Sequence, residues 1–315
     1  MKRKKEIDVI CVGEALIDFI GHQPGVLINH TRDYHRYLGG SPTNVAMNLA
    51  RLGLQPAMVA TVGNDGFGEY ILHRLEEVHI DTNHLRRIDE EPTSTVFVSR
   101  SSATPDFIPY RAADCNILAS QLPSDLIAKA SIFHTTCFAL SKNPARDVIL
   151  AKAKEASEAG CKLSIDVNYA QKIWPDRKEA AKTLREYCGY NPLIKVSEDD
   201  MERYFNKTLS EKEIFDYFHG FGADLICLTL GKNGVKLSQK SKPTIHLPAV
   251  KINEVMDATG AGDAFWSGFL YAYVSKLPLE KALEIALRLA ALKLQNVGRL
   301  PNNINVISDL LKEEI

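Results

Sequence analysis

The sequence lacks the short motifs that identify many nucleotide-binding and metal-dependent enzymes. It contains no G-x-x-x-x-G-K-[ST] loop, no G-x-G-x-x-G fingerprint and no H-R-D catalytic loop, and its nine histidines form no H-E-x-x-H pair. P-loop, dinucleotide-dependent, protein-kinase and zinc-hydrolase chemistry therefore has no support from these fingerprints.

Paired cysteines, excess charge and long apolar runs are also missing. The six cysteines are scattered without a C-x-x-C pair, which favours buried free thiols in a reducing compartment over a zinc or redox site. A net charge of −1 gives no reason to expect nucleic acid or an anionic membrane as a partner. The basic start "MKRKKEIDVI" leads into an apolar run broken by Gly13, Glu14 and Asp18, so we expect no signal peptide and no membrane span. These features predict a cytoplasmic protein.

Short apolar runs alternate with longer amphipathic runs along most of the 315 residues. The predicted strands are "DVICVG", "AMVATVG", "SIFHTTC", "CKLSIDV", "LIKVS" and "DLICLTLG", and predicted helices include "GEYILHRLEEV" and "ARDVILAKAKEASEAG". Such alternation predicts an α/β fold with a mostly parallel central sheet flanked by helices on both faces. No repeat or linker divides the chain, so we expect one domain over residues 1–315.

Two segments, 19–38 and 92–112, interrupt this alternation. Residues 93–98 (TSTVFV) alternate like a strand, and an antiparallel flap over the active site would account for both segments, although two ordinary surface loops would also fit. The edge of a flap strand at 92–100 would need a cover. Pairing with a second copy would provide one, which predicts a homodimer.

The stretch "DATGAGDAFWSG" (257–268) lies between a predicted strand, "VKINEV", and a predicted helix, "AFWSGFLYAYVSKL". Gly260 and Gly262 allow a turn whose N–H groups point one way and bind an anion, and the following helix adds the positive end of its dipole. Asp263 then lies in the first turn of this helix. From the spacing alone, Asp263 is a base beside the bound anion or merely a cap for the helix.

A second glycine stretch, "LGGSPTNVAMNLARLG" (38–53), also precedes a predicted helix. Gly39 and Gly40 permit close backbone approach, and Asn44 both donates and accepts hydrogen bonds in the first turn. Asp18 follows the first predicted strand, at the end of the sheet where ligands bind. A third stretch, "LTLGKNGVKL" (228–237), places Thr229, Gly231 and Gly234 at a strand end, which indicates an ordinary hairpin or a nucleotide cradle.

The second stretch and the "DATGAGD" stretch together resemble the two signature regions of the PfkB (ribokinase-like) carbohydrate kinases, in the same order and over essentially the whole chain. The resemblance implies a ribokinase-like fold with a small β lid, and phosphorylation of a sugar hydroxymethyl group by ATP with Mg²⁺. It also leaves room for a monovalent cation such as K⁺. By similarity, the base would be Asp263, and the phosphoryl group would be held by Gly260, Ala261 and Gly262.

The resemblance extends to the ligand-binding residues. The sugar would be bound by Asp18, Gly39, Gly40 and Asn44. The ATP phosphates would lie along Thr229, Gly231 and Gly234, with Asn296 on the adenine side. "SEDD" (197–200) resembles the segment that organises Mg²⁺ and its waters, with Ser197 and Asp200 where many relatives carry Asn and Glu.

The sugar is predicted from the segments "DFIPYRAAD" (106–114) and "DVNYAQKIW" (166–174), which resemble those of fructokinases and of 2-keto-3-deoxygluconate and 5-dehydro-2-deoxygluconate kinases. Asp166 and Asn168 match the D-x-N-x-R pattern of these relatives, but Ala170 stands at the arginine position. Arg111 could supply a carboxylate clamp instead. We place fructose ahead of the two acids, and keep a nucleoside kinase and a non-catalytic sugar or nucleotide binder as alternatives.

Overall fold

The computed structural model describes residues 5–100, 106–298 and 300. The described strands are β1 (Ile7–Val12), β2 (Leu16–Gly21), β3 (Tyr34–Gly39), β4 (Pro56–Gly63), β5 (Leu85–Ile88), β6 (Thr95–Val98), β7 (Phe107–Tyr110), β8 (Ala130–Thr136), β9 (Lys162–Asp166), β10 (Leu193–Ser197), β11 (Leu225–Thr229), β12 (Val235–Gln239) and β13 (Ile245–Leu247). The described α-helices are α1 (Ser41–Arg51), α2 (Gly66–Glu76), α3 (Ser124–Lys129), α4 (Ala145–Glu158), α5 (Arg177–Cys188), α6 (Glu198–Phe205), α7 (Glu211–Gly220), α8 (Ala261–Val274) and α9 (Leu279–Leu294).

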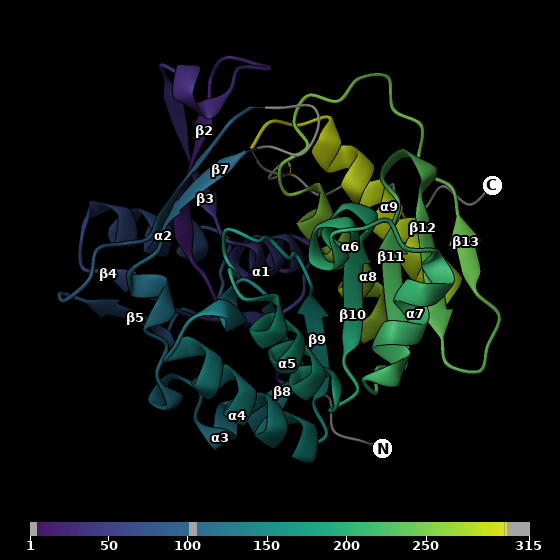
Figure 1. The fold of residues 1–315 in the computed structure, drawn as a ribbon. Coiled ribbons are helices and arrows are strands. Elements are labelled where there is room, and N and C mark those ends of the chain that lie inside the picture. Colours follow the sequence, from purple (N-terminus) through teal and green to yellow (C-terminus); the bar gives the residue numbers. More distant parts are fainter. Residues whose placement is uncertain (1–4, 101–105, 299, 301–315) are drawn as a thin grey trace.

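The described strands form a nine-stranded sheet in the order β13-β12-β11-β10-β9-β8-β1-β4-β5 (Figure 1). Neighbours from β11 to β5 pair in parallel, whereas β12 and β13 are antiparallel. The carboxyl ends of the parallel strands therefore meet along one edge, where the fold positions its ligand site.

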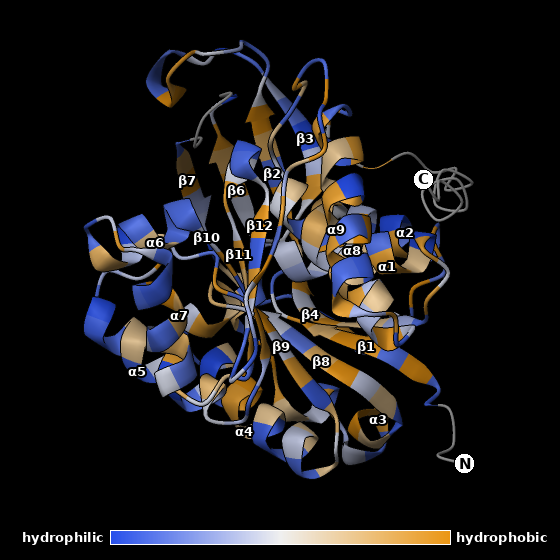
Figure 2. Ribbon diagram, turned by 90° about the vertical axis from the view of Figure 1, so that its right-hand side faces the viewer, coloured by the Kyte–Doolittle hydropathy of each residue, from blue (hydrophilic) through white to orange (hydrophobic). Residues whose placement is uncertain are grey.

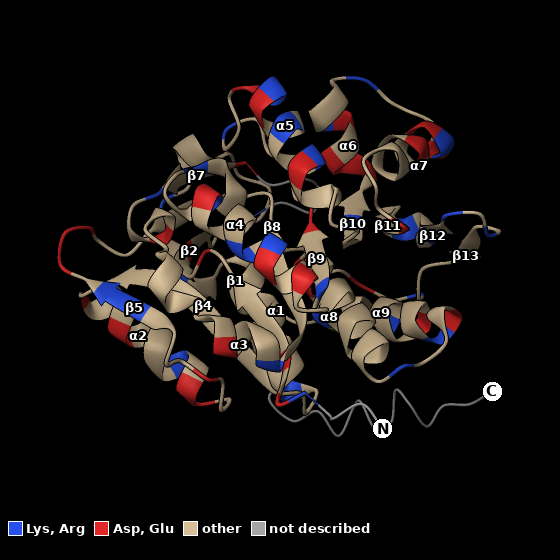
Figure 3. Cartoon of the chain, turned by 90° about the horizontal axis from the view of Figure 1, so that it is seen from below, with Lys and Arg blue, Asp and Glu red and all other residues tan. Residues whose placement is uncertain are grey.

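Helices cover both faces of this sheet, because its strands bury side chains on both sides. In β1, Val9 and Cys11 pack with α1, α2, α8 and α9, whereas Ile10 and Val12 pack with α3 to α7. Apolar strands consequently lie inside a shell of amphipathic helices (Figure 2). Acidic and basic residues both occur along outer helices such as α5 and α7 (Figure 3). The predicted α/β architecture is confirmed.

A second sheet, in the order β3-β2-β6-β7 among the described residues, forms a lid. It confirms the expected lid but corrects its details. The lid begins at Leu16, and β2 pairs in parallel with β6, so the lid is mixed and not wholly antiparallel. Residues 101–105 of the expected segment 92–112 lie outside the described residues.

Two further predictions need correction. "VKINEV" (250–255) is not a strand, because it pairs with none of the described strands and leaves Val250 and Val255 exposed. Strand β6 is not an edge strand either, because it lies between β2 and β7. Within the described lid, β3 and β7 form the edges.

The state of the cysteines and the character of the helices both agree with the composition. All six cysteines are buried free thiols, as predicted. Among the described helices, none has the length and apolar character that a membrane crossing requires.

We predict that the lid mediates a homodimer. Strand β7 is an edge on which Ile108 and Tyr110 are 39% and 60% exposed, and covering such an edge stabilises it. Light scattering at micromolar concentration should give the mass of a dimer, and Ile108→Lys should shift the protein toward monomer without changing its circular dichroism. A monomeric wild-type protein would contradict this prediction.

Candidate active site

The carboxylate of Asp263 lies where the N-termini of α1 and α8 meet. The Ser41 hydroxyl donates to Asp263 Oδ1 over 2.6 Å, and Asn44 Nδ2 donates to Asp263 Oδ2 over 2.8 Å. Helix α8 has Gly260 at its N-cap position and no side-chain cap. Asp263 is thus held by α1, across the site, and a role as a mere cap for its own helix has no support.

The backbone of the loop before α8 turns at Gly260, whose φ is 76°. Gly262, predicted to share this role, instead belongs to the first turn of α8 and has no positive φ. Its lack of a side chain serves a different purpose, because a Cβ there would lie 2.9 Å from Lys195 Nζ. Gly260 therefore makes the turn, and Gly262 makes room for a buried ammonium.

Lys195, on β10, was not singled out from the sequence. Its Nζ lies 3.0 and 2.9 Å from the two carboxylate oxygens of Asp166, and the two side chains are only 6% and 2% exposed. Burial opposes the charged form of Lys195, but the carboxylates of Asp166 and Asp200 outweigh it and raise the pKa of the lysine. Asp166, predicted to bind the sugar, is in fact the buried partner of this lysine.

Glu14 is a second residue that sequence reasoning missed. Its Oε1 accepts from the Ser41 N–H over 3.2 Å, and its Oε2 accepts from the Thr136 hydroxyl over 3.0 Å. A Cβ on Gly40 would lie 2.2 Å from the Glu14 carbonyl oxygen. The close approach that Gly40 permits is therefore to the protein's own backbone, and it fixes where α1 begins. A lone acid in an apolar run (VGEALI) was the available signal.

Asp18 lies in lid strand β2 and not directly after the first strand of the main sheet, as the sequence had suggested. It pairs with Tyr37 of β3, and the missing side chain of Gly39 leaves space for its carboxylate, because a Cβ there would lie 2.4 Å from Asp18 Cγ. Burial raises the pKa of Asp18 to about 7, and the nearby negative charges of Asp263 and Asp257 add to this.

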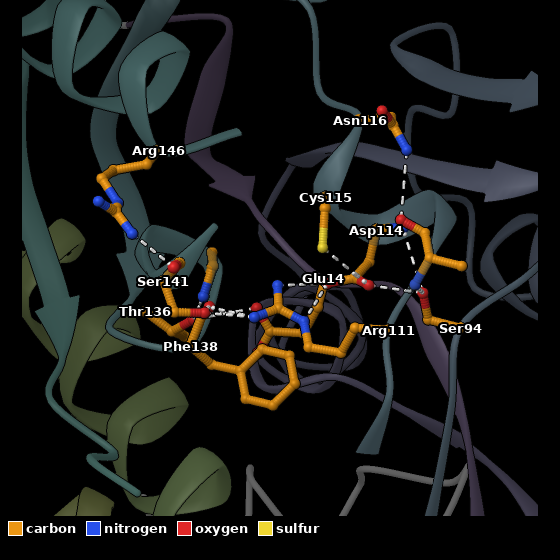
Figure 4. Close-up of polar contacts among 12 residues, drawn as sticks. Glu14, Ser94, Arg111, Asp114, Cys115, Asn116, Thr136, Phe138, Ser141 and Arg146 are labelled. Carbon is orange, nitrogen blue, oxygen red and sulfur yellow. Dashed lines mark hydrogen bonds and ion pairs between the residues drawn. The ribbon is translucent and has the colours of Figure 1, made fainter. Parts of the chain in front are cut away.

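Arg111 does not present a free clamp for a substrate carboxylate, which corrects the sequence-based expectation. Its Nε and Nη2 donate to Asp114 Oδ2 over 2.9 and 2.6 Å, and its Nη1 donates to the Phe138 carbonyl and to Ser141. The guanidinium also stacks on the Phe138 ring, and the side chain is 3% exposed. Figure 4 shows these contacts joining the lid segment to the end of β8.

The residues predicted for the nucleotide and metal side make contacts within their own elements. The Ser197 hydroxyl accepts from the Asp200 N–H at the start of α6, while the Asp200 carboxylate accepts from the Ser197 N–H and from Arg203. Asn296 donates to the Leu292 carbonyl. Among the described residues, no three His, Cys, Asp or Glu side chains are grouped to hold a metal ion. Binding roles for these residues stay predictions.

The third glycine stretch is a hairpin, as one of its two interpretations predicted. Thr229 ends β11 and pairs with Val235 of β12 across a short 3₁₀ turn. Both Gly231 and Gly234 have positive φ, and a Cβ on Gly234 would lie 2.1 Å from the Leu247 carbonyl oxygen. A hairpin at the carboxyl end of β11 remains compatible with a nucleotide cradle at the same place.

A cavity of about 530 Å³ is lined by Asp18, Asn44, Gly260 and Arg51, among others, and Asn44 also contacts the Asp263 carboxylate. Along this cavity, the buried Nε and Nη2 atoms of Arg51 have no partner among the described residues. Asn168 Oδ1 also lacks one there, but it lies at a separate cavity that Phe107 and Phe138 line. The cavity beside Asn44 thus offers hydroxyl acceptors near Asp263 and a buried cation.

Taken together, the site pairs a carboxylate with two helix N-termini and a buried ammonium at the ligand end of an α/β sheet. Such an arrangement can hold a phosphoryl group while a carboxylate accepts a proton from an attacking hydroxyl. It defines a kinase that acts on small hydroxylated molecules. The comparisons with known proteins agree: residues 6–304 match the pfkB family of carbohydrate kinases, and the chain belongs to that family.

Individual relatives support an ATP-dependent sugar kinase. The chain is 37% identical to an ATP-dependent 6-phosphofructokinase of Thermoanaerobacterium thermosaccharolyticum, over 93% of this chain and 90% of the relative. It is 33% identical to probable fructokinase-7 of Arabidopsis thaliana, over 98% and 94%. A Vibrio cholerae fructokinase variant solved with fructose, ADP and potassium ion superposes with a TM-score of 0.85 at 25% identity, covering 99% of this chain and 100% of that one.

We predict a pH dependence set by Asp18. Because the pKa of its carboxyl is raised to about 7, the group is protonated below that pH and ionised above it. An ionised carboxylate is the stronger acceptor for a sugar hydroxyl. The kcat/KM for the sugar should therefore rise by up to about tenfold per pH unit below pH 7 and level off above it.

The matched variant Asp18→Asn cannot ionise and should flatten this profile while lowering kcat/KM throughout. Measured profiles of kcat/KM from pH 5 to 9 for both proteins would show whether Asp18 is the titrating group. A rise through pH 7 that persists in Asp18→Asn would assign the titration to another group.

Proposed function

We propose that this kinase transfers the terminal phosphoryl group of ATP to a primary hydroxyl of fructose. The observation that carries the proposal is the position of Asp263, which Ser41 and Asn44 hold between two helix N-termini, next to a cavity that Asn44 lines together with Asp18. A hydroxyl placed there would meet a base and an anion-binding site at once.

Each residue has a physical task in this reaction. Asp263 accepts the proton of the attacking hydroxyl. The N–H group of Gly262, in the first turn of α8, would face the phosphoryl group, whereas the N–H group of Ala261 already donates to the Ala258 carbonyl over 3.2 Å. The buried ammonium of Lys195 adds positive charge beside Gly262. Because the transition state of phosphoryl transfer is loose, positioning and charge neutralisation do most of the catalytic work.

The nucleotide would lie along the hairpin at Thr229, Gly231 and Gly234. Magnesium, when bound, neutralises charge on the ATP phosphates, and it ordinarily keeps several waters and takes few protein ligands. Asp200 fits such a role only through water, since both of its oxygens already accept hydrogen bonds from Ser197 and Arg203.

The preference for a neutral sugar over the two sugar acids rests on positions 170 and 111, neither of which offers a free cation to pair with a substrate carboxylate. Ala170 stands at the position where these sugar and sugar-acid kinases often carry arginine, so a carboxylate finds no cation there, and Arg111 is occupied by Asp114, Phe138 and Ser141. A carboxylate would also meet the negative environment of Asp18 and Asp263. Relatives named fructokinase are consistent with this choice.

Fructose 6-phosphate is a second candidate, supported by Arg51. The Nε and Nη2 atoms of this buried guanidinium have no partner in the described residues, and the same cavity is lined by Arg36 and Arg74. A phosphate on the far end of the sugar would satisfy these donors. A relative named 6-phosphofructokinase agrees with this alternative.

Replacing Asp263 by Asn tests the chemistry. The substitution preserves size, and the Ser41 hydroxyl can turn to accept from the new amide nitrogen, but the base is lost. The kcat should therefore fall by roughly 10²–10⁴-fold while ADP affinity and the melting temperature stay close to wild type. Asp216→Asn, on the exposed side of α7, is the matched control and should leave kcat unchanged. A kcat within threefold of wild type for Asp263→Asn would exclude it as the base.

Substrate choice is tested by measuring kcat/KM for fructose, fructose 6-phosphate and both sugar acids. Fructose should exceed the acids by at least about tenfold, or 1.4 kcal/mol of transition-state preference. Arg51→Met should leave fructose unchanged if fructose is the substrate, but should lower kcat/KM for fructose 6-phosphate by at least about tenfold if the phosphate binds there. Preference for an acid, abolished by Arg111→Ala, would overturn the proposed order.

A further inference from the structure

Lys293 is a buried lysine for which the proposed chemistry has no task. It lies in the last turn of α9, and its side chain is 4% exposed. Its Nζ lies 3.1 Å from Asp257 Oδ2 and donates to the Asn296 carbonyl over 3.0 Å. Burial lowers the pKa of this lysine, and the Asp257 carboxylate opposes the shift. The ammonium is therefore held by oxygen atoms from both sides.

Asp257 opens the loop that ends at Asp263. Its carboxylate accepts from the Thr259 N–H and the Gly298 N–H, each over 3.0 Å, in addition to Lys293. Burial alone would raise the pKa of Asp257, but Lys293 and these two N–H groups lower it. The charged pair thus ties the start of the loop to the chain segment after α9.

The place between Asp257 and Asn296 suits either a lysine ammonium or a bound metal ion. Carboxylate and carbonyl oxygens are the ligands that hard cations take in proteins, and the carbonyl end of α9 favours positive charge. The lysine also reaches the turn itself, because a Cβ on Gly260 would lie 3.6 Å from Lys293 Cε. Whatever cation lies here sets the position of the turn before α8.

We propose that Lys293 is an internal cation that takes the place of a bound monovalent ion beneath the loop 257–263. A structural relative was solved with potassium ion, and the family resemblance allowed for one here. A dissociable potassium ion does not fit between Asp257 and Asn296 in this chain, because the lysine ammonium already bridges their oxygen atoms. The loop is then held in its working position without potassium.

The wild-type enzyme provides the first test. Its kcat and its KM for ATP should change by less than about twofold when KCl is replaced by tetramethylammonium chloride at constant ionic strength. Its melting temperature should be equally insensitive to this exchange. Activation by potassium of about tenfold or more would overturn the proposal.

The second test asks whether a variant without the lysine becomes dependent on a bound ion for its stability and activity. Lys293→Ala removes the ammonium and leaves space for an ion. It also leaves the buried Asp257 carboxylate without its cationic partner. In tetramethylammonium chloride this variant should melt at least about 5 °C lower than wild type and lose at least about tenfold in kcat. Potassium or ammonium ion should restore both, since binding to the folded state alone raises stability.

Two further variants separate this role from ordinary packing. Lys281→Ala on the exposed side of α9 should show neither loss nor cation response. The double variant Asp257→Asn/Lys293→Ala has neither charge of this pair, so it should fold in either salt and not respond to potassium. The proposal fails if Lys293→Ala folds but neither its melting temperature nor its kcat responds to the ion. It also fails if Lys293→Ala stays unfolded in potassium while the double variant does respond to it.

Discussion

The constraint on which the rest of the site depends is the burial of several carboxylates in one small region. At the ligand end of the sheet, Asp166 and Asp257 are buried and Asp263 is half-buried. Negative charge in a low-dielectric interior is costly unless it is compensated. The protein compensates with two buried lysines, Lys195 and Lys293, and with the N-termini of α1 and α8. Each compensating group comes from a different part of the chain, so the site exists only in the complete fold.

This constraint also separates the carboxylates by task. Asp166 and Asp257 have ammonium partners and act on the backbone and on other side chains. Within the described parts of the chain, the donors to the Asp263 carboxylate are the neutral groups of Ser41 and Asn44, so it remains available to a hydroxyl. These aspartates thus differ in function because their hydrogen-bond and ionic partners differ.

The sequence predicted those parts of the fold that local pattern determines. The alternation of apolar runs predicted the sheet with helices on both faces, and the glycine stretches predicted where α1 and α8 begin. The lid pairing and the roles of Lys195, Glu14 and Arg111 could not be predicted, because each depends on contacts between distant residues. The Arg111 guanidinium, for example, meets Phe138 and Ser141 from another strand end, and an isolated arginine in a lid segment carries no sign of that.

The connection between the lid and the main body is very short. Strand β3 ends at Gly39 and α1 begins at Ser41, so Gly40 alone separates the lid from the helix that holds the Asp263 carboxylate. A lid that tilts about Gly40 would leave Ser41 in place, because the Glu14 carboxylate accepts from its N–H group, but it would move Asp18 of β2 relative to Asp263. The base would then stay aligned while the lid carries the sugar hydroxyl toward it. Closure over the sugar and the arrival of the hydroxyl at the base would be one movement.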